Sequence, residues 1–209
     1  MARKVVTEER VRWEVSLFAP YESPGIDGIF PALLQKELDI LIEIIIKIFR
    51  ACIAYGYTPV QWRTSRVVFV PKPGRMDYIL VKSFRPISLM SFFLKTVERL
   101  VDRNVRDDIL TRYPLHSNQH AYKAGKSTDS ALHILVGRIE MALNNKEYAL
   151  GVFLDIEGAF NNASPGSLLH VLSVRRVSST IIQWIDSMLS SRIARVNSGD
   201  INMEVHLTK

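Results

Sequence analysis

The stretch of sequence that decides the fold is FLDIEGAF, residues 153–160, in which Asp155 directly follows an apolar run. The run, residues 149–154, reads ALGVFL and is apolar enough for a buried central strand, so we predict a strand over Tyr148–Leu154. Such a strand delivers Asp155 to its carboxyl edge, where side-chain and backbone oxygens can share a cation. Phe160 follows Asp155 closely enough to return to the same neighbourhood. The alternative is a structural role, in which Asp155 caps the next turn.

The composition is that of a chain able to form one large or two small domains. It has 209 residues, 47% of them hydrophobic, and a net charge of +6. The positive charge favours polyanionic partners, of which nucleic acid is one. Cys52 is the only cysteine, which excludes an internal disulfide and a thiolate zinc cluster. We expect an intracellular, reducing location, in the nucleus or the cytoplasm.

The most apolar helical stretch, Leu38 to Phe49, is expected to face a protein core. It carries Asp39, Glu43 and Lys47 at four-residue intervals, which places the three charges on one face of a helix. Charges at this spacing would be costly in the centre of a bilayer. We therefore expect no membrane partner.

Hydrophobic periodicity and turn signals divide the rest of the chain into short elements. Helices are expected over about residues 7–19, from Pro31 to near Gly56, and over 91–110, 127–144, 165–174 and 179–190; strands are expected over 62–70, 148–154, 193–197 and 203–207.

Two basic residues lie in stiff, proline-containing loops. Lys72 belongs to the turn PKPG at residues 71–74, and Arg85 to SFRPISL at residues 83–89. Two cations on consecutive rigid loops suit a triphosphate, because Arg can grip it in bidentate fashion and Lys acts as a point charge. The alternative is ordinary solvated surface charge.

Two other patterns look like active-site motifs and fail on closer inspection. The tripeptide Gly125-Lys126-Ser127 resembles the end of a phosphate-binding P-loop, but His120 occupies the place of its first glycine. The pair Asp107-Asp108 lies within a helical pattern and is expected to be solvated.

The ordered segments together resemble the reverse transcriptase of non-LTR retrotransposons of the jockey-like kind. The matching blocks are SPGIDG (23–28), Trp62 with VFVPKPG (68–74), SFRPISL (83–89), QHAYKAGKST (119–128) and residues 153–161. The blocks follow the family's order along almost the whole chain. The second basic loop reads Arg85-Pro86-Ile87-Ser88, whereas group II intron and retron enzymes typically have Arg-Pro-Leu-Gly there; a fragment of that type is the alternative within polymerases.

The resemblance implies a helix-rich α+β fold, namely the fingers and an incomplete palm of a right-hand polymerase. Residues 1–140 would form the fingers and residues 141–209 the incomplete palm, with thumb and endonuclease absent from this stretch. Asp155 and the backbone carbonyl of Ile156 would hold Mg²⁺, with two ions in the intact family enzyme.

The resemblance also implies a nucleotide-binding set. Lys72 and Arg85 would contact the incoming triphosphate, assisted by backbone N–H groups near Gly158 and Ala159. Phe160 would be the steric gate that leaves no space for a ribose 2′-hydroxyl.

The implied partners are an RNA template, a DNA primer and deoxynucleoside triphosphates, with Lys123 and Lys126 near the template strand. The family next presents a Gly/Gln loop and an aromatic-x-Asp-Asp hairpin, and Lys209 comes before both. We therefore expect that residues 1–209 alone lack the full catalytic set and are inactive or nearly so, although the family they resemble is one of enzymes. The alternative function is a non-catalytic nucleic-acid-binding remnant.

Overall fold

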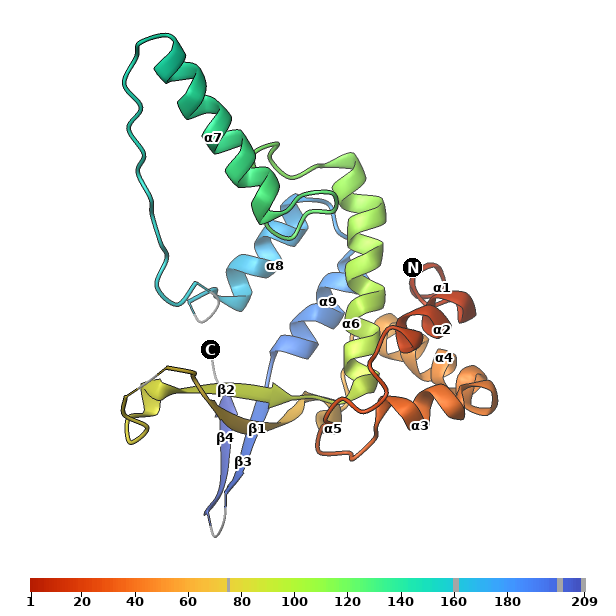
Figure 1. Cartoon of the computed structure of the whole chain (residues 1–209). Coiled ribbons are helices and arrows are strands. Elements are labelled where there is room, and N and C mark those ends of the chain that lie inside the picture. Colours follow the sequence, from red (N-terminus) through yellow and green to blue (C-terminus); the bar gives the residue numbers. More distant parts are fainter. Residues whose placement is uncertain (75, 160–161, 199–200, 208–209) are drawn as a thin grey trace. The chain divides into compact units, whose positions relative to one another are not determined.

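The computed structural model of the chain describes residues 1–74, 76–159, 162–198 and 201–207, and it shows a helix-rich α+β protein with one mixed sheet (Figure 1). The elements are, in order, α1 (Ala2–Val5), α2 (Glu8–Ser16), α3 (Pro31–Lys36), α4 (Leu38–Ala54), α5 (Val60–Arg63), β1 (Thr64–Pro71), the 3₁₀ turn η1 (Val81–Ser83), β2 (Phe84–Leu89), α6 (Phe92–Asn104), the π-helical η2 (Val105–Leu110), α7 (Thr128–Asn144), α8 (Pro165–Val174), α9 (Ser179–Leu189), β3 (Arg192–Ser198) and β4 (Ile201–Leu207).

Several of the helices, namely α2, α6, α7 and α8, begin at residues whose side chains cap them. Thr7 caps α2 by accepting a hydrogen bond from the backbone N–H of Arg10 at 3.3 Å, and Ser91 caps α6 in the same way. Such caps satisfy backbone donors that have no partner inside the helix. The predicted helices over 7–19, 91–110, 127–144, 165–174 and 179–190 are confirmed to within a few residues.

The predicted long helix from Pro31 to near Gly56 is wrong in one respect, because it is two helices. The backbone leaves α-helical geometry at Glu37, which ends α3 and precedes α4. Leu34 and Leu38, on either side of this break, are both buried in the core. Pro31 stands at the first position of α3, where its missing N–H costs nothing.

The sheet has the strand order β2-β1-β3-β4. Strand β1 pairs antiparallel with β2 and parallel with β3, and β4 closes the sheet as an antiparallel neighbour of β3. Strand β2 was not predicted from the sequence. Its Pro86 cannot donate to a ladder, which an edge strand tolerates.

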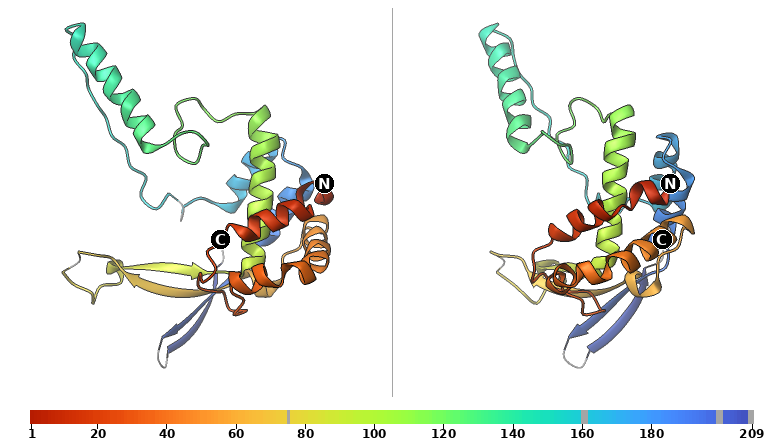
Figure 2. Two further views of the ribbon diagram at one scale, coloured as in Figure 1. Left: turned by 45° about the vertical axis from the view of Figure 1, so that its right-hand side comes forward. Right: turned by 90° about the vertical axis from the view of Figure 1, so that its right-hand side faces the viewer.

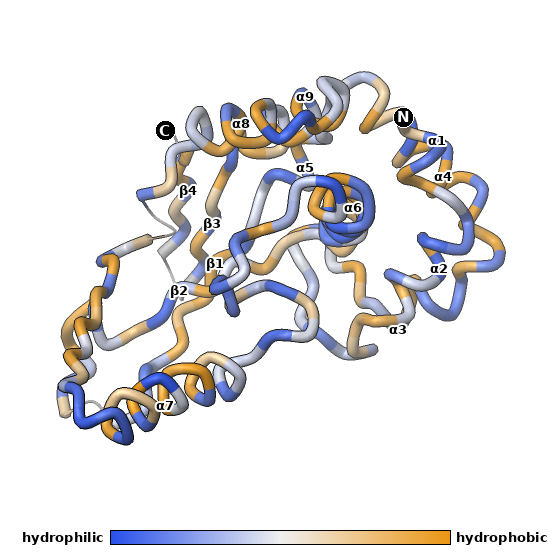
Figure 3. The backbone as a smooth tube through the Cα atoms, turned by 90° about the horizontal axis from the view of Figure 1, so that it is seen from above, coloured by the Kyte–Doolittle hydropathy of each residue, from blue (hydrophilic) through white to orange (hydrophobic). Residues whose placement is uncertain are grey.

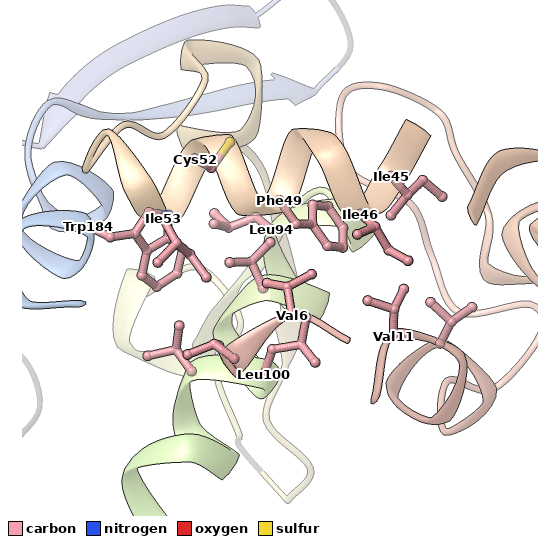
Figure 4. Packing of buried hydrophobic residues seen from close by; sticks show 14 of the residues in the cluster. Val6, Val11, Ile45, Ile46, Phe49, Cys52, Ile53, Leu94, Leu100 and Trp184 are labelled. Atoms are coloured by element: carbon pink, nitrogen blue, oxygen red, sulfur yellow. The ribbon is translucent and has the colours of Figure 1, made fainter. Parts of the chain in front are cut away.

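The hydrophobic core lies between α4, α6, α9 and the two N-terminal helices (Figure 4). Phe49 and Ile53 of α4 point toward Leu94 of α6 and Trp184 of α9, and Val6 fills the space beside them. Figure 3, in which α6 is seen end-on, shows both polar and apolar residues on its turns, as expected for a helix with one buried face. The prediction that Leu38 to Phe49 faces a core is therefore confirmed. Within the described residues, no helix is both long and apolar enough to cross a membrane.

The chain divides into two compact units. Unit 1 comprises residues 1–109 and 164–209, and unit 2 comprises residues 110–163. The whole hydrophobic core belongs to unit 1, whereas none of the described residues of unit 2 is buried. This division does not follow the predicted boundary at residue 140, and the assignment to fingers and palm stays a prediction.

The predicted strand Tyr148–Leu154 is wrong in this structure. These residues carry no strand pairing, and their large side chains are exposed, Leu154 to 91% and Phe153 to 84%. A strand exists only when another strand satisfies its backbone groups, and the ladders of the described sheet involve β1 to β4 alone. The apolar run therefore has the composition of a central strand, but in the described part of the chain no other strand pairs with it.

Candidate nucleotide-binding site

The hairpin of β1 and β2 carries both basic residues that were predicted to contact a triphosphate. Arg85 pairs with Val70, and the backbone N–H of Lys72 donates to the carbonyl of Ser83 at 2.8 Å just beyond the last strand pair. Lys72 and Arg85 are thus diagonal neighbours across the hairpin. Both views in Figure 2 show this hairpin projecting away from the helices of unit 1. The structure brings these two predicted residues together.

The two cations differ in how firmly they are held. Lys72 is partly buried, and its Nζ donates to the carbonyl of Lys82 at 2.7 Å. Arg85 is exposed and lies in β2, one residue before Pro86. A fixed lysine beside a guanidinium open to solvent gives a point charge and a fork-shaped donor within one short segment. Such a pair is suited to phosphate oxygens.

Asp155, the predicted metal ligand, is exposed and lies in unit 2. It does not occupy the end of a strand, because the residues before it form no strand. Its Oδ1 accepts a hydrogen bond from the backbone N–H of Ile156 at 3.0 Å. A carboxylate and a backbone carbonyl are the oxygen donors that Mg²⁺ prefers. Among the described residues, however, no three His, Cys, Asp or Glu side chains lie close enough together to hold a metal ion. The described donors fit a cation in kind but do not complete its coordination.

The residues after Asp155 form a compact turn. Gly158 has φ +61° and accepts a hydrogen bond from the N–H of Asn162 at 2.9 Å. The side chain of Asn162 donates to the carbonyl of Glu157 at 3.1 Å and closes the same turn. Ala159 lies within it, whereas Phe160, the predicted steric gate, lies outside the described residues.

Lys123 and Lys126 belong to a loop of unit 2 that ends at the start of α7. Ser127 caps that helix by accepting from the N–H of Ser130, while Ser130 Oγ donates to the Ser127 carbonyl at 2.8 Å. His120 Nδ1 lies 2.9 Å from Ser130 Oγ. This contact joins the loop that carries Lys123 and Lys126 to the first turn of α7. The segment that resembles a P-loop thus serves to cap α7.

The acidic pair predicted to be solvated lies on η2, where Asp107 is exposed as expected and Asp108 is partly buried. Asp108 pairs with Lys4 at 3.1 Å, and Asp107 lies 3.9 Å from Arg10. These ion pairs tie the end of α6 to the N-terminal helices. The pair has a structural role rather than a catalytic one.

Sequence reasoning missed the residues that surround Lys72. Tyr78 donates its hydroxyl to the Lys72 carbonyl at 3.0 Å, and Lys82 and Ser83 accept from Lys72 as described above. The sequence did offer one signal for this contact, namely that Tyr78 is an aromatic residue with a hydroxyl group between two rigid loops. The contact from Tyr78 to Lys72 depends on the path of the loop and cannot be derived from spacing.

Comparison with known proteins gives the same family as the order of the sequence motifs. The family model described as reverse transcriptase (RNA-dependent DNA polymerase) matches residues 70–207, which include the end of β1, all of β2 and the Asp155 turn. Since this match covers well over half of the chain, the chain belongs to the reverse transcriptase family. Reverse transcriptases generally use divalent metal ions, an RNA template and nucleotide substrates.

The curated relatives come from mobile elements. The chain is 33% identical over 140 residues to the probable RNA-directed DNA polymerase from transposon BS of Drosophila melanogaster, covering 67% of this chain and 15% of that protein. It is 31% identical over 189 residues to the RNA-directed DNA polymerase from mobile element jockey of Drosophila funebris, covering 90% of this chain and 20% of that protein. The chain thus spans between 15% and 20% of the length of these relatives.

Proposed function

We propose that this chain forms the nucleotide-binding part of an RNA-directed DNA polymerase of a jockey-like non-LTR retrotransposon. In this proposal residues 1–140 serve as fingers and residues 141–209 as an incomplete palm. The observation that carries the proposal is the hairpin that makes Lys72 and Arg85 diagonal neighbours, within the region that matches the family. Its role is to neutralise the triphosphate of an incoming deoxynucleotide, since phosphoryl transfer depends mainly on positioning and charge stabilisation.

We further propose Asp155 and the Ile156 carbonyl as donors to Mg²⁺, with the backbone near Gly158 and Ala159 contacting the nucleotide. A bound divalent ion would stabilise the charge on the reacting phosphoryl oxygens. The exposure of Asp155 and its oxygen chemistry support this role. Because the described residues complete no metal site, no reaction step is assigned to Asp155 in the chain by itself.

Lys123 and Lys126 are proposed to contact the template strand. Both lie in a loop held by its own hydrogen bonds, including that from the Lys126 N–H to the Lys123 carbonyl at 3.2 Å. This ordered basic loop also supports the second candidate function, nucleic-acid binding without catalysis. Under either function residues 1–209 alone should bind RNA and extend no primer, whereas Asp155-dependent primer extension by this chain would overturn that expectation.

Binding of a fluorescent deoxynucleotide tests the proposed function directly. We expect residues 1–209 to bind N-methylanthraniloyl-dATP, with inorganic tripolyphosphate as a competitor. Lys72→Ala and Arg85→Ala should each weaken binding by about five- to tenfold, because each removes a charge-assisted contact to phosphate. Lys47→Ala, which removes the same charge from the exposed face of α4, is the matched control. If both site variants bind as tightly as the control, the hairpin is not a triphosphate site.

A further inference from the structure

The loop between β1 and β2, here named the tip loop and described at residues 72–74 and 76–83, is closed by its own hydrogen bonds. It lies at the far end of the hairpin from the helices of unit 1 (Figure 1). The 3₁₀ turn η1 ends it, with the Ser83 N–H donating to the Leu80 carbonyl at 2.9 Å. Ser83 Oγ donates to the carbonyl of Asp77 at 2.5 Å, and Ser83 is buried. The loop is therefore folded on itself.

Three different groups of Lys72 are held by this loop. Its N–H donates to the Ser83 carbonyl, its Nζ donates to the Lys82 carbonyl, and its own carbonyl accepts from the Tyr78 hydroxyl at 3.0 Å. The first two contacts involve only main-chain acceptors, which any residue at positions 82 and 83 would supply. The third depends on the hydroxyl of one particular side chain.

Tyr78 also reaches the opposite strand. Its ring meets that of Phe84 edge to face, with the ring centroids 6.1 Å apart and the planes inclined at 68°. This is a favourable geometry for an aromatic pair. Phe84 is the first residue of β2 and immediately precedes Arg85. One side chain thus contacts Lys72 on one side of the hairpin and the neighbour of Arg85 on the other.

We propose that Tyr78 is a positioning residue that fixes the spacing between Lys72 and Arg85 for a triphosphate. The inference rests on the proposed function, in which these two cations bind the nucleotide. Tyr78 itself is held in place, because the side chain of the preceding Asp77 accepts from the Ile79 N–H at 2.7 Å and its carbonyl accepts from Ser83. A loop ordered before the ligand arrives avoids the entropy cost of ordering during binding.

The test uses the full chain, N-methylanthraniloyl-dATP as probe and the variant Tyr78→Phe, which removes the hydroxyl and keeps the ring. We expect binding to weaken about two- to tenfold, the range for one lost hydrogen bond. Tyr21→Phe, at a side chain that is 86% exposed, is the matched control. In a Lys72→Ala background the same change should have little further effect, since the two residues act through one contact.

Hydrogen exchange distinguishes positioning from a general loss of structure. In Tyr78→Phe the amide of Lys72 should exchange faster by a similar factor, while the amides in the middle of β1, such as that of Val68, keep their protection. Equal acceleration along the whole strand would show that Tyr78 merely stabilises the hairpin and would overturn the proposal.

The outcomes separate this inference from the proposed function. If Lys72→Ala weakens binding but Tyr78→Phe does not, the inference is wrong and the function stands. If the hydroxyl matters equally with and without Lys72, Tyr78 acts elsewhere and the inference is wrong. If neither wild type nor Lys72→Ala binds the probe, the proposed function fails and the positioning role fails with it.

Discussion

Gly25, in the SPGIDG block at residues 23–28, offers the sharpest test of how the N-terminal segment packs. A Cβ built at this position would lie 2.7 Å from the backbone N of Ser91 and 2.8 Å from the backbone C of Met90. Carbon atoms in good contact lie about 3.5–4.0 Å apart, so an added methyl group overlaps main chain that cannot rotate away. The block therefore contains a glycine because it lies directly against the start of α6.

The expected cost of Gly25→Ala combines two effects. Overpacking of a tight site destabilises by about 1–3 kcal/mol. Ser91 is also the cap of α6, whose hydroxyl accepts from Phe93 N–H, and loss of such a cap costs about 1 kcal/mol. We expect the substitution to lower the free energy of unfolding of unit 1 by about 2–4 kcal/mol.

Urea unfolding followed by tryptophan fluorescence measures this cost, because Trp13, Trp62 and Trp184 all belong to unit 1. With a slope of about 2 kcal/mol per molar urea, the midpoint should fall by about 1–2 M. Gly166→Ala is the control, since a Cβ there meets nothing within 4 Å and the residue lies in α8. That control should be neutral or slightly stabilising. A Gly25→Ala midpoint equal to wild type would refute the close packing of this loop.

Three further results are expected. Burial raises the pKa of the Cys52 thiol to about 11, so Ellman's reagent at pH 8 should leave it unmodified until urea is added, and rapid reaction in native buffer would contradict its burial. Burial also raises the pKa of Glu98 above its ordinary 4.5, although Arg192 lies 3.9 Å away and lowers it. The folded chain then binds the Glu98 proton more tightly than the unfolded chain, so stability falls as pH rises above about 4.5. Glu98→Gln should therefore be more stable than wild type at pH 7, and this difference in stability should shrink toward pH 4. A difference that stays the same at both pH values would exclude the burial of Glu98 as its cause. Lys126→Ala should weaken RNA binding and reduce the slope of log K against log salt by about 1, whereas an unchanged slope would remove Lys126 from the phosphate contacts.

The elements that could be predicted from the sequence are those with local causes. Thr7, Ser91 and Ser127 cap helices through contacts that span two or three residues, and the helices start where those side chains predict. Lys72 and Arg85 could be proposed as a pair because each lies in a short, proline-stiffened segment. The hairpin that joins them could not be predicted in the same way, because it also needs β2.

The features that could not be predicted depend on distant partners. The apolar run at residues 149–154 has the composition of a central strand, yet a strand also needs a neighbour, and composition does not supply one. Strand β2 was missed because Pro86 within it argues against a strand, unless that strand is known to lie at the edge of a sheet. The contact between Tyr78 and Lys72 depends on the path of the tip loop, which no periodicity encodes.

The parallel pairing of β1 with β3 has a consequence for how the chain folds. The Ser65 hydroxyl of β1 donates to the Ile193 carbonyl of β3 across a separation of 128 positions. The residues of unit 2 all lie between β1 and β3 in the sequence. The entropy of closing so long a loop must be overcome before the pairing gives any stability, and contacts of this kind slow folding. During synthesis on the ribosome, the β1–β2 hairpin can form early, whereas the centre of the sheet waits until β3 has emerged. A nascent chain stalled before residue 192 would expose the unpaired side of β1, and that edge is where association with other chains would begin.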